Sequence, residues 1–215
     1  MQSQHLALPK RGSRYFNAVA IGLSIAVTAV VARRIGEQDS EGAAVVAGQA
    51  LWIGGIASIV ISVVGVTLAE PLLRAMGASN AAISQRAGYN YVMFGGYGSM
   101  LFLFLLNGVF RGAGDASIAM RALWFANAIN IVLDPRLILG IGPFPELGLE
   151  GAAVATTIGR SCGVALQFYY MFGRRTRVQL PPKHLRPRFK KMFDLVRVSI
   201  GGIMQFFIAT SSWVF

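Results

Sequence analysis

The chain has 215 residues, of which 54% are hydrophobic and 13% are charged, and its mean hydropathy is +0.56. Soluble domains carry about 25% charged residues, so this composition argues against a soluble fold. The net charge of +11 is typical of nucleic-acid-binding proteins. However, eight of the 20 basic residues lie in one segment, 173–191, which lacks a set of stacking aromatic residues, and we therefore exclude nucleic acid as a partner.

Long uncharged runs predict an all-α, polytopic membrane helix bundle. Four runs contain no Asp, Glu, Lys or Arg: 15–32, 43–69, 87–110 and 198–215. Each is close to the roughly 20 residues that a helix needs to cross a bilayer. Two further apolar stretches contain a charge or two. We expect about six transmembrane helices, over residues 15–33, 43–69, 86–109, 117–140, 149–172 and 193–215.

The charged segments predict how the chain is organised in the membrane. We expect the protein in the inner (plasma) membrane of the cell. Basic residues favour the cytoplasmic side, which places the loops 34–42, 110–116 and 173–192 in the cytoplasm. Lys10, Arg11 and Arg14 would then lie outside, which an odd number of further helices before this chain would explain. The chain ends inside an apolar span, "SSWVF", so we expect further helices after it as well. The predicted parts are a tail (1–14), five helices (15–172), a basic interlobe loop (173–192) and the first helix of a second lobe (193–215).

The two short cytoplasmic loops, "ARRIGEQDSEG" (32–42) and "FRGAGDAS" (110–117), resemble each other. In each, a helix ends with Arg and Gly, and an aspartate follows. Glycine is typical of the left-handed helix C-cap, while Asp39 and Asp115 suit helix N-termini. The shared pattern indicates an internal repeat. A third glycine segment, "GGYG" at 95–98, predicts either a hinge or a packing notch, and we favour the notch.

Asp134 is the one acidic residue in the interior of a predicted span, because Glu150 and Asp194 lie at the second position of theirs and belong to the membrane surfaces. A charged side chain at mid-membrane costs about 2.5–3.5 kcal/mol on insertion scales, so its presence indicates a function. Asn130 and Asn127 lie four and seven residues before it, which predicts one polar stripe on a helix. Pro135 predicts a bend that exposes backbone oxygen beside the carboxylate. Carboxylate and amide oxygens suit a hard cation, and a buried carboxylate also suits a proton.

Arg160, near the middle of the fifth predicted helix, leaves two interpretations open. It pairs with Asp134 across a cavity, or it reaches water on its own. The spans offer no second aspartate to form a protease pair, and no Ser/His or zinc-ligand set. The single cysteine, Cys162, excludes clustered cysteine metal sites. We therefore predict a protein that is not an enzyme and uses no cofactor other than a coupling ion.

Four blocks of sequence, in this order and spacing, resemble the multidrug and toxic compound extrusion (MATE) transporters. They read "GLSIAVTAVVARRIGEQD" (22–39), "LNGVFRGAGDAS" (106–117), "NAINIVLDPRLILGIGP" (127–143) and "LGLEGAAVATTIGR" (147–160). The resemblance implies a fold of twelve helices in two lobes, of which this chain holds the second to the seventh. It also implies a proton or sodium site at an acid of the fifth family helix. Asp134 matches that acid, Asn130 its amide partner and Thr156 a hydroxyl on the next helix.

The resemblance implies secondary active efflux of amphipathic or cationic compounds by proton- or sodium-coupled antiport. Its implied partners are the lipid bilayer, a small-molecule substrate and the missing C-terminal lobe. Two alternatives remain. Relatives in the same superfamily flip lipid-linked oligosaccharides, but they line the cavity with several cations, whereas here Arg160 alone qualifies. The chain could also be a truncated membrane protein that does not transport.

Overall fold

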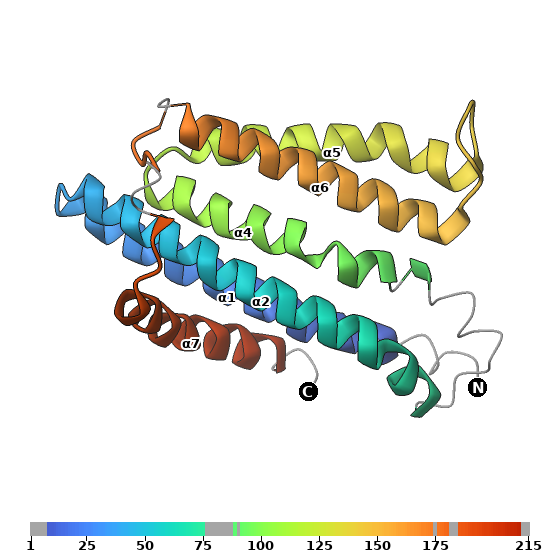
Figure 1. Ribbon diagram of the computed structural model, residues 1–215, viewed down its shortest axis with the longest axis horizontal. Coiled ribbons are helices and arrows are strands. Elements are labelled where there is room, and N and C mark those ends of the chain that lie inside the picture. Colours follow the sequence, from blue (N-terminus) through green and yellow to red (C-terminus); the bar gives the residue numbers. More distant parts are fainter. Residues whose placement is uncertain (1–7, 76–87, 90, 174–175, 181–184, 212–215) are drawn as a thin grey trace. The chain divides into compact units, whose positions relative to one another are not determined.

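The computed structural model describes residues 8–75, 88–89, 91–173, 176–180 and 185–211. Within these ranges the chain is helical and contains no strand, which confirms the predicted all-α class (Figure 1). The helices are α1 (Leu8–Gly36), α2 (Ser40–Ala75), α4 (Tyr97–Gly112), α5 (Ala116–Leu139), α6 (Gly148–Phe172) and α7 (Phe189–Ser211). The largest differences at the starts of helices are at α1, which includes part of the expected tail, and at α7, which includes the end of the expected basic loop. Residues 1–7 and 212–215 lie outside the described residues.

Two helices in the described part of the chain are long and apolar enough to cross a membrane by a test of length and composition. They cover Ser40–Thr67, with a mean hydropathy of 2.1, and Ala116–Leu139, with a mean hydropathy of 1.4. The sequence predicts six such helices. The α4 helix is the clearest difference, because its 16 residues span only about 24 Å at 1.5 Å per residue.

The predicted helix over 86–109 is interrupted at Gly96. Residues 91–95 are helical, Gly96 forms a turn, and α4 follows from Tyr97. The Ser99 N–H and Oγ both donate to the Gly96 carbonyl oxygen, at 3.1 and 2.8 Å, so this turn is tighter than an α-helix. A Cβ at Gly96 would lie 2.5 Å from Thr157 Cγ2. The segment "GGYG" is therefore both a packing notch against α6 and a break in the helix.

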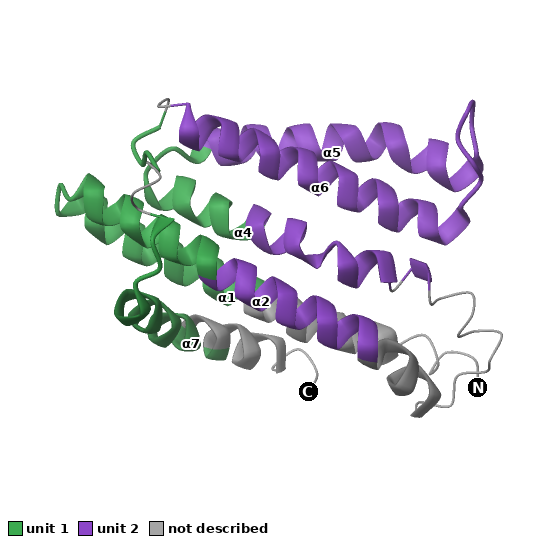
Figure 2. Ribbon diagram, in the orientation of Figure 1, with its two compact units in different colours: residues 1–52, 104–116, 174–215 green, residues 53–103, 117–173 purple. Residues whose placement is uncertain are grey.

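Two compact units make up the chain, and both contain parts of α2 and α4 (Figure 2). Unit 1 comprises residues 1–52, 104–116 and 174–215. Unit 2 comprises residues 53–103 and 117–173. The predicted Asn127, Asn130, Asp134, Thr156 and Arg160 all belong to unit 2.

In unit 1, α1 and α4 run in the same direction and pack closely through small residues. Ser24 Oγ donates to the Phe104 carbonyl oxygen at 2.7 Å, and Thr28 Oγ1 donates to the Gly108 carbonyl oxygen at 3.1 Å. A Cβ at Gly108 would lie 2.7 Å from the Ser24 carbonyl oxygen, and one at Gly112 would lie 2.6 Å from that of Thr28. Gly108 and Gly112 thus form a GxxxG contact of the kind that lets membrane helices approach closely.

The turns after α1 and α4 in unit 1 share one hydrogen-bond pattern, as their sequences predict. Asp39 N–H donates to the Arg34 carbonyl oxygen at 2.9 Å, and Asp115 N–H donates to that of Phe110 at 2.8 Å. Each turn is a Schellman motif. Gly114 has the predicted left-handed conformation, with φ +82°, but in the first turn Gln38 adopts it, with φ 59°, and Gly36 does not. The left-handed residue is therefore set by its position in the motif.

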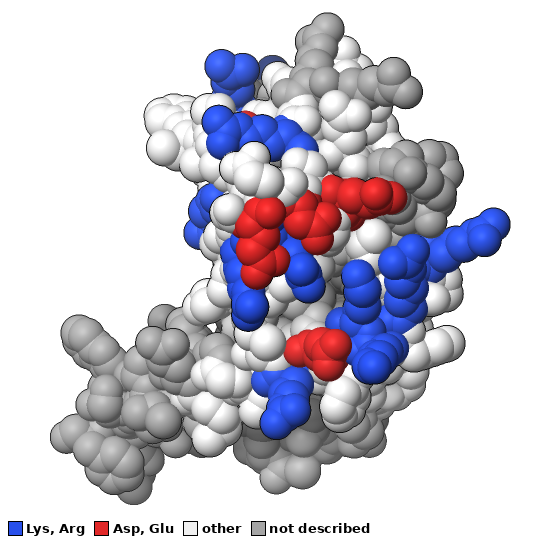
Figure 3. Space-filling view, turned by 90° about the vertical axis from the view of Figure 1, so that its left-hand side faces the viewer, with Lys and Arg blue, Asp and Glu red and all other residues white. Residues whose placement is uncertain are grey.

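The aspartates that follow these turns have different partners. Asp39 Oδ1 accepts the Gly42 N–H at 2.7 Å, which is the predicted N-cap of α2. Asp115 Oδ2 accepts the Arg177 N–H at 2.8 Å and so holds the basic loop. In the first turn Glu37 accepts a hydrogen bond from Arg33 at 2.9 Å, and this bond lowers the pKa of Glu37. Figure 3 shows basic side chains gathered beside acidic ones on one face of the molecule.

The basic loop is an ordered part of unit 1 over its described residues. Val178 and Leu180 are buried, and Trp52 Nε1 donates to the Leu185 carbonyl oxygen. The buried Gln49 amide makes two further bonds, one from Nε2 to the Arg186 carbonyl oxygen at 3.0 Å and one to Oε1 from the Arg188 N–H at 2.7 Å. This pairing fixes the loop against α2 immediately before α7, which packs beside α1 (Figure 1).

Replacing Gln49 with leucine should release this loop. The substitution removes both bonds and leaves two backbone groups without their partner, at about 1–3 kcal/mol each. We expect trypsin to cleave after Arg188 at least about tenfold faster, because cleavage requires local opening. Arg186 is not a cleavage site, because Pro187 follows it. Limited proteolysis with mass spectrometry measures this. Trp52→Phe, which removes one bond, should give a smaller increase, and equal rates for all three proteins would contradict the role assigned to Gln49.

Candidate functional site

The α5–α6 hairpin of unit 2 positions the candidate site. Buried small residues recur at every fourth position of α6: Gly151, Ala155, Gly159 and Gly163. Gly159 and Gly163 face a seam of buried alanines on α5 that includes Ala122 and Ala126. A Cβ at Gly163 would lie 3.1 Å from Ala126 Cβ, and one at Gly159 would lie 2.8 Å from the Ala126 carbonyl oxygen. This small-residue packing brings the two backbones together.

Asn130 and Asp134 continue the alanine seam at intervals of four residues. Both have an Oδ1 atom that is buried and has no hydrogen-bond partner within the described part of the chain. A Cβ at Gly159 would overlap Asn130 Oδ1, so the asparagine amide lies against α6 at this glycine. Buried polar atoms without partners are rare and call for an explanation.

The register of α5 against α6 places Asp134 opposite the turn of α6 that includes Ala155 and Thr156. Two contacts define this register: Asn130 meets Gly159, and the Leu137 carbonyl oxygen meets Gly151. On α5, Asp134 lies between Asn130 and Leu137. On α6, Thr156 lies between Gly151 and Gly159. Thr156 Oγ1 donates to the Ala152 carbonyl oxygen at 2.8 Å, which leaves the lone pairs of the hydroxyl oxygen as acceptors.

Pro135 does not interrupt α5. The α5 helix continues through Pro135 to Leu139. The missing N–H affects one bond near the helix end, and proline is tolerated in membrane helices when neighbouring helices support the backbone. Because Pro135 has no N–H, the Ile131 carbonyl oxygen one turn earlier lacks its usual helical donor, and its exposure beside Asp134 stays a prediction.

Asn127 does not join the other two polar residues. It is exposed, whereas Asn130 and Asp134 are half-buried. The reason is its position directly after Ala126, because one residue turns a helix by about 100° and takes Asn127 off the buried seam. The predicted stripe thus divides into a half-buried pair and an exposed asparagine.

Arg160 lies one residue after Gly159 and is half-buried. It interacts electrostatically with Tyr89 and Tyr97, which also belong to unit 2. Asp134 and Arg160 are both described, and no ion pair joins them. Of the two interpretations left open by the sequence, direct pairing with Asp134 is therefore wrong for this conformation.

Two residues that make important contacts, Gly159 and Gln49, were not predicted from the sequence. Gly159 could have been found from the four-residue repeat of small residues in "GAAVATTIGRSCG". Gln49 is an uncharged polar residue in an apolar run, and no local pattern distinguishes it. Across the described residues, no group of three or more His, Cys, Asp or Glu side chains could hold a metal ion.

Comparisons with known proteins also point to a membrane transporter of the family that the sequence resembles. The family model MatE matches residues 11–135. The FAD transporter of Shewanella oneidensis is 32% identical over 72% of this chain and 34% of its own length. The probable multidrug resistance protein YoeA of Bacillus subtilis is 29% identical over 89% of this chain and 42% of its own. A MOP superfamily transporter from Pyrococcus furiosus, described as having a binding pocket of reverse polarity, superposes with a TM-score of 0.82 at 31% identity over 92% of this chain and 43% of its own.

Proposed function

Because the chain belongs to the MatE family, a family of polytopic helical membrane transporters, we propose that it acts in secondary active efflux of amphipathic or cationic compounds. The driving ion is a proton or sodium, and its site is Asp134 with Asn130 and Thr156. The chain spans 34% and 42% of the length of the two curated relatives above. The missing C-terminal lobe is therefore the partner with which it completes alternating access.

The observation that supports this site best is the pair of buried oxygens on α5, Asn130 Oδ1 and Asp134 Oδ1, which have no partner among the described residues. A carboxylate inside a membrane span is costly, and it is retained when it binds an ion or lies on a substrate pathway. Proton binding neutralises Asp134 and gives it an O–H donor. Sodium would instead take oxygen ligands from the carboxylate, the Asn130 amide and the Thr156 hydroxyl.

Coupling follows from this exchange of charge. With an ion bound, the site is neutral, and with the ion released, a buried negative charge favours a conformation that admits a cationic substrate. Imposing pH and sodium gradients separately on cells or liposomes with the full-length gene product identifies the ion. Efflux driven by neither gradient would reject ion-coupled antiport.

An anionic amphipathic substrate is the second candidate, and Arg160 favours it. This arginine has no ion-pair partner in the described part of unit 2, and the relative at 32% identity is an FAD transporter. Arginine binds phosphate groups through paired hydrogen bonds. An FAD-like dinucleotide would use Arg160 in this way, whereas a cationic compound would be repelled by it.

Arg160→Gln should distinguish these two substrate classes. We expect it to reduce transport of FAD at least about tenfold, because it removes a charge-assisted hydrogen bond, while efflux of a cationic dye stays equal or increases. Arg136→Gln, at an exposed arginine of α5, is the matched control and should change neither. Loss of dye efflux with unchanged FAD transport would reject the anionic substrate.

The proposed location is the inner, or plasma, membrane, with the basic loop 173–192 in the cytoplasm. The positive-inside rule supports this orientation, as does the position of the two Schellman turns and the described part of the loop in one unit. Cysteine labelling of a variant such as Arg177→Cys from either side of intact cells would test it.

A further inference from the structure

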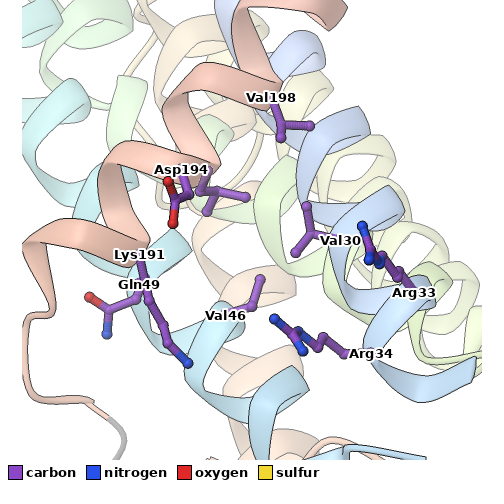
Figure 4. Close-up of a pocket in the computed structure, with 9 residues that line it drawn as sticks. Val30, Arg33, Arg34, Val46, Gln49, Lys191, Asp194 and Val198 are labelled. Carbon is purple, nitrogen blue, oxygen red and sulfur yellow. The ribbon is translucent and has the colours of Figure 1, made fainter. Parts of the chain in front are cut away.

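An open cleft of about 290 Å³ lies in unit 1 between α1, α2 and the first turns of α7 (Figure 4). Arg33 and Arg34 line it from α1, and Lys191 and Asp194 line it from α7. The cleft contains both signs of charge and is separate from the residues of the coupling site, which lie in unit 2.

The charged side chains on the α1 wall have ion-pair partners within the described part of the chain, whereas those on the α7 wall do not. Arg33 and Arg34 pair with Glu37 at 2.9 and 3.1 Å, and Arg34 also lies 3.5 Å from Asp39. Neither Lys191 nor Asp194 makes a side-chain hydrogen bond or ion pair with another described residue, although they are three residues apart on one helix. The α7 wall therefore offers one cation and one anion that are available to a ligand.

The remainder of the lining is mainly apolar. It comprises Val30, Val46, Leu195 and Val198, together with Gln49, whose amide is already bonded to the loop backbone at Arg186 and Arg188. Beside the cleft, the aromatic residues Phe189 and Phe193 of α7 are 80% and 69% exposed. Exposed phenylalanines beside lysines are typical of helices that lie at the boundary between lipid headgroups and acyl chains. The cleft thus combines a charged headgroup region with walls that suit a hydrocarbon chain.

We propose that this cleft binds a phospholipid with a zwitterionic ethanolamine headgroup. The lipid phosphate accepts hydrogen bonds from Lys191, and its primary ammonium donates to the Asp194 carboxylate. The start of an acyl chain packs against Val30 and Val198. A purely anionic headgroup would leave Asp194 facing a like charge, and a choline headgroup has no N–H to donate. Both should bind less well.

The test is a comparison of lipids that share the same acyl chains. The full chain is purified in detergent, mixed with equal amounts of phosphatidylethanolamine, phosphatidylglycerol and phosphatidylcholine, and examined by native mass spectrometry. We expect about a fivefold preference for the ethanolamine lipid, the size of one exposed ionic contact. Equal retention of the three lipids by the unmodified protein overturns the proposal.

Variants assign the preference to the two side chains. Asp194→Asn should remove the preference for ethanolamine, Asp194→Glu should retain it, and Lys191→Gln should weaken binding of all three lipids. Lys190→Gln, which changes a neighbouring exposed lysine outside the cleft lining, should have no effect. An unchanged preference in Asp194→Asn overturns the assignment. Soluble phosphoethanolamine should displace little lipid, and complete displacement at equal concentration would show a site for the free headgroup instead.

Discussion

Replacing Asp134 with asparagine is expected to abolish ion-driven efflux by the full-length gene product while leaving its expression and membrane insertion unchanged. Asparagine preserves the size of the side chain and removes its charge and its capacity to exchange a proton. The neighbouring Asn130 Oδ1, which is buried without a partner in the described part of the chain, gains a possible donor. The protein should therefore stay folded, and efflux should fall to the level of cells without the gene.

The control for this variant is Glu146→Gln, at an exposed acid in the loop between α5 and α6. It makes the same chemical change outside the buried pair and should leave efflux unchanged. Drug resistance and dye efflux, corrected for protein level, measure both variants. Normal efflux by Asp134→Asn would reject Asp134 as the coupling residue.

Gly151→Ala adds one methyl group and should lower the stability of the protein more than Gly→Ala at the other glycines of unit 2 described above. A Cβ at this position would overlap the Leu137 carbonyl oxygen and lie 2.6 Å from the Leu137 carbonyl carbon and 3.1 Å from the Ile138 nitrogen. These are backbone atoms and cannot rotate away, so α5 and α6 must separate. We expect a cost of about 1–3 kcal/mol, which corresponds to a thermal midpoint lower by about 3–10 °C for a chain of this size.

The matched substitution is Gly55→Ala in α2. Its Cβ would have one neighbour, Phe102 Cζ at 3.8 Å, which is an ordinary contact. Alanine is a better helix former than glycine by about 1 kcal/mol, so this variant should be neutral or slightly more stable. Thermal unfolding in detergent, followed by size-exclusion chromatography, compares the two. Equal midpoints would contradict the close packing of α6 on α5.

Helix positions and turn chemistry could be predicted from the sequence because their causes are local. Uncharged runs located the helices to within a few residues at most ends. The shared order of an arginine, a glycine and a following aspartate located the two repeated turns. The break at Gly96 was harder to place, because "GGYG" does not by itself distinguish close packing from a local 3₁₀-like turn. That outcome depends on Thr157 of α6, which is distant in the sequence.

The candidate site was predictable in part for a similar reason. The cost of a charge in a membrane span identified Asp134, and a four-residue interval identified Asn130. The exposure of Asn127 depends on which side of α5 meets α6, and this side is set by the glycines and alanines of both helices. Helical periodicity alone placed Asn127, Asn130 and Asp134 on one broad face of α5. Only the position of the alanine seam separates the exposed Asn127 from the other two. The role of Gln49 required the path of the basic loop, which no local pattern provides.

Ion release on substrate binding tests the central claim most directly. The full-length protein in weakly buffered detergent solution is mixed with substrate, and released protons are followed with a pH dye and released sodium with an ion-selective electrode. The account predicts that substrate releases one of these ions from the unmodified protein and that Asp134→Asn releases none, although it still binds substrate. Equal ion release by both proteins would contradict the assignment of the coupling ion to Asp134.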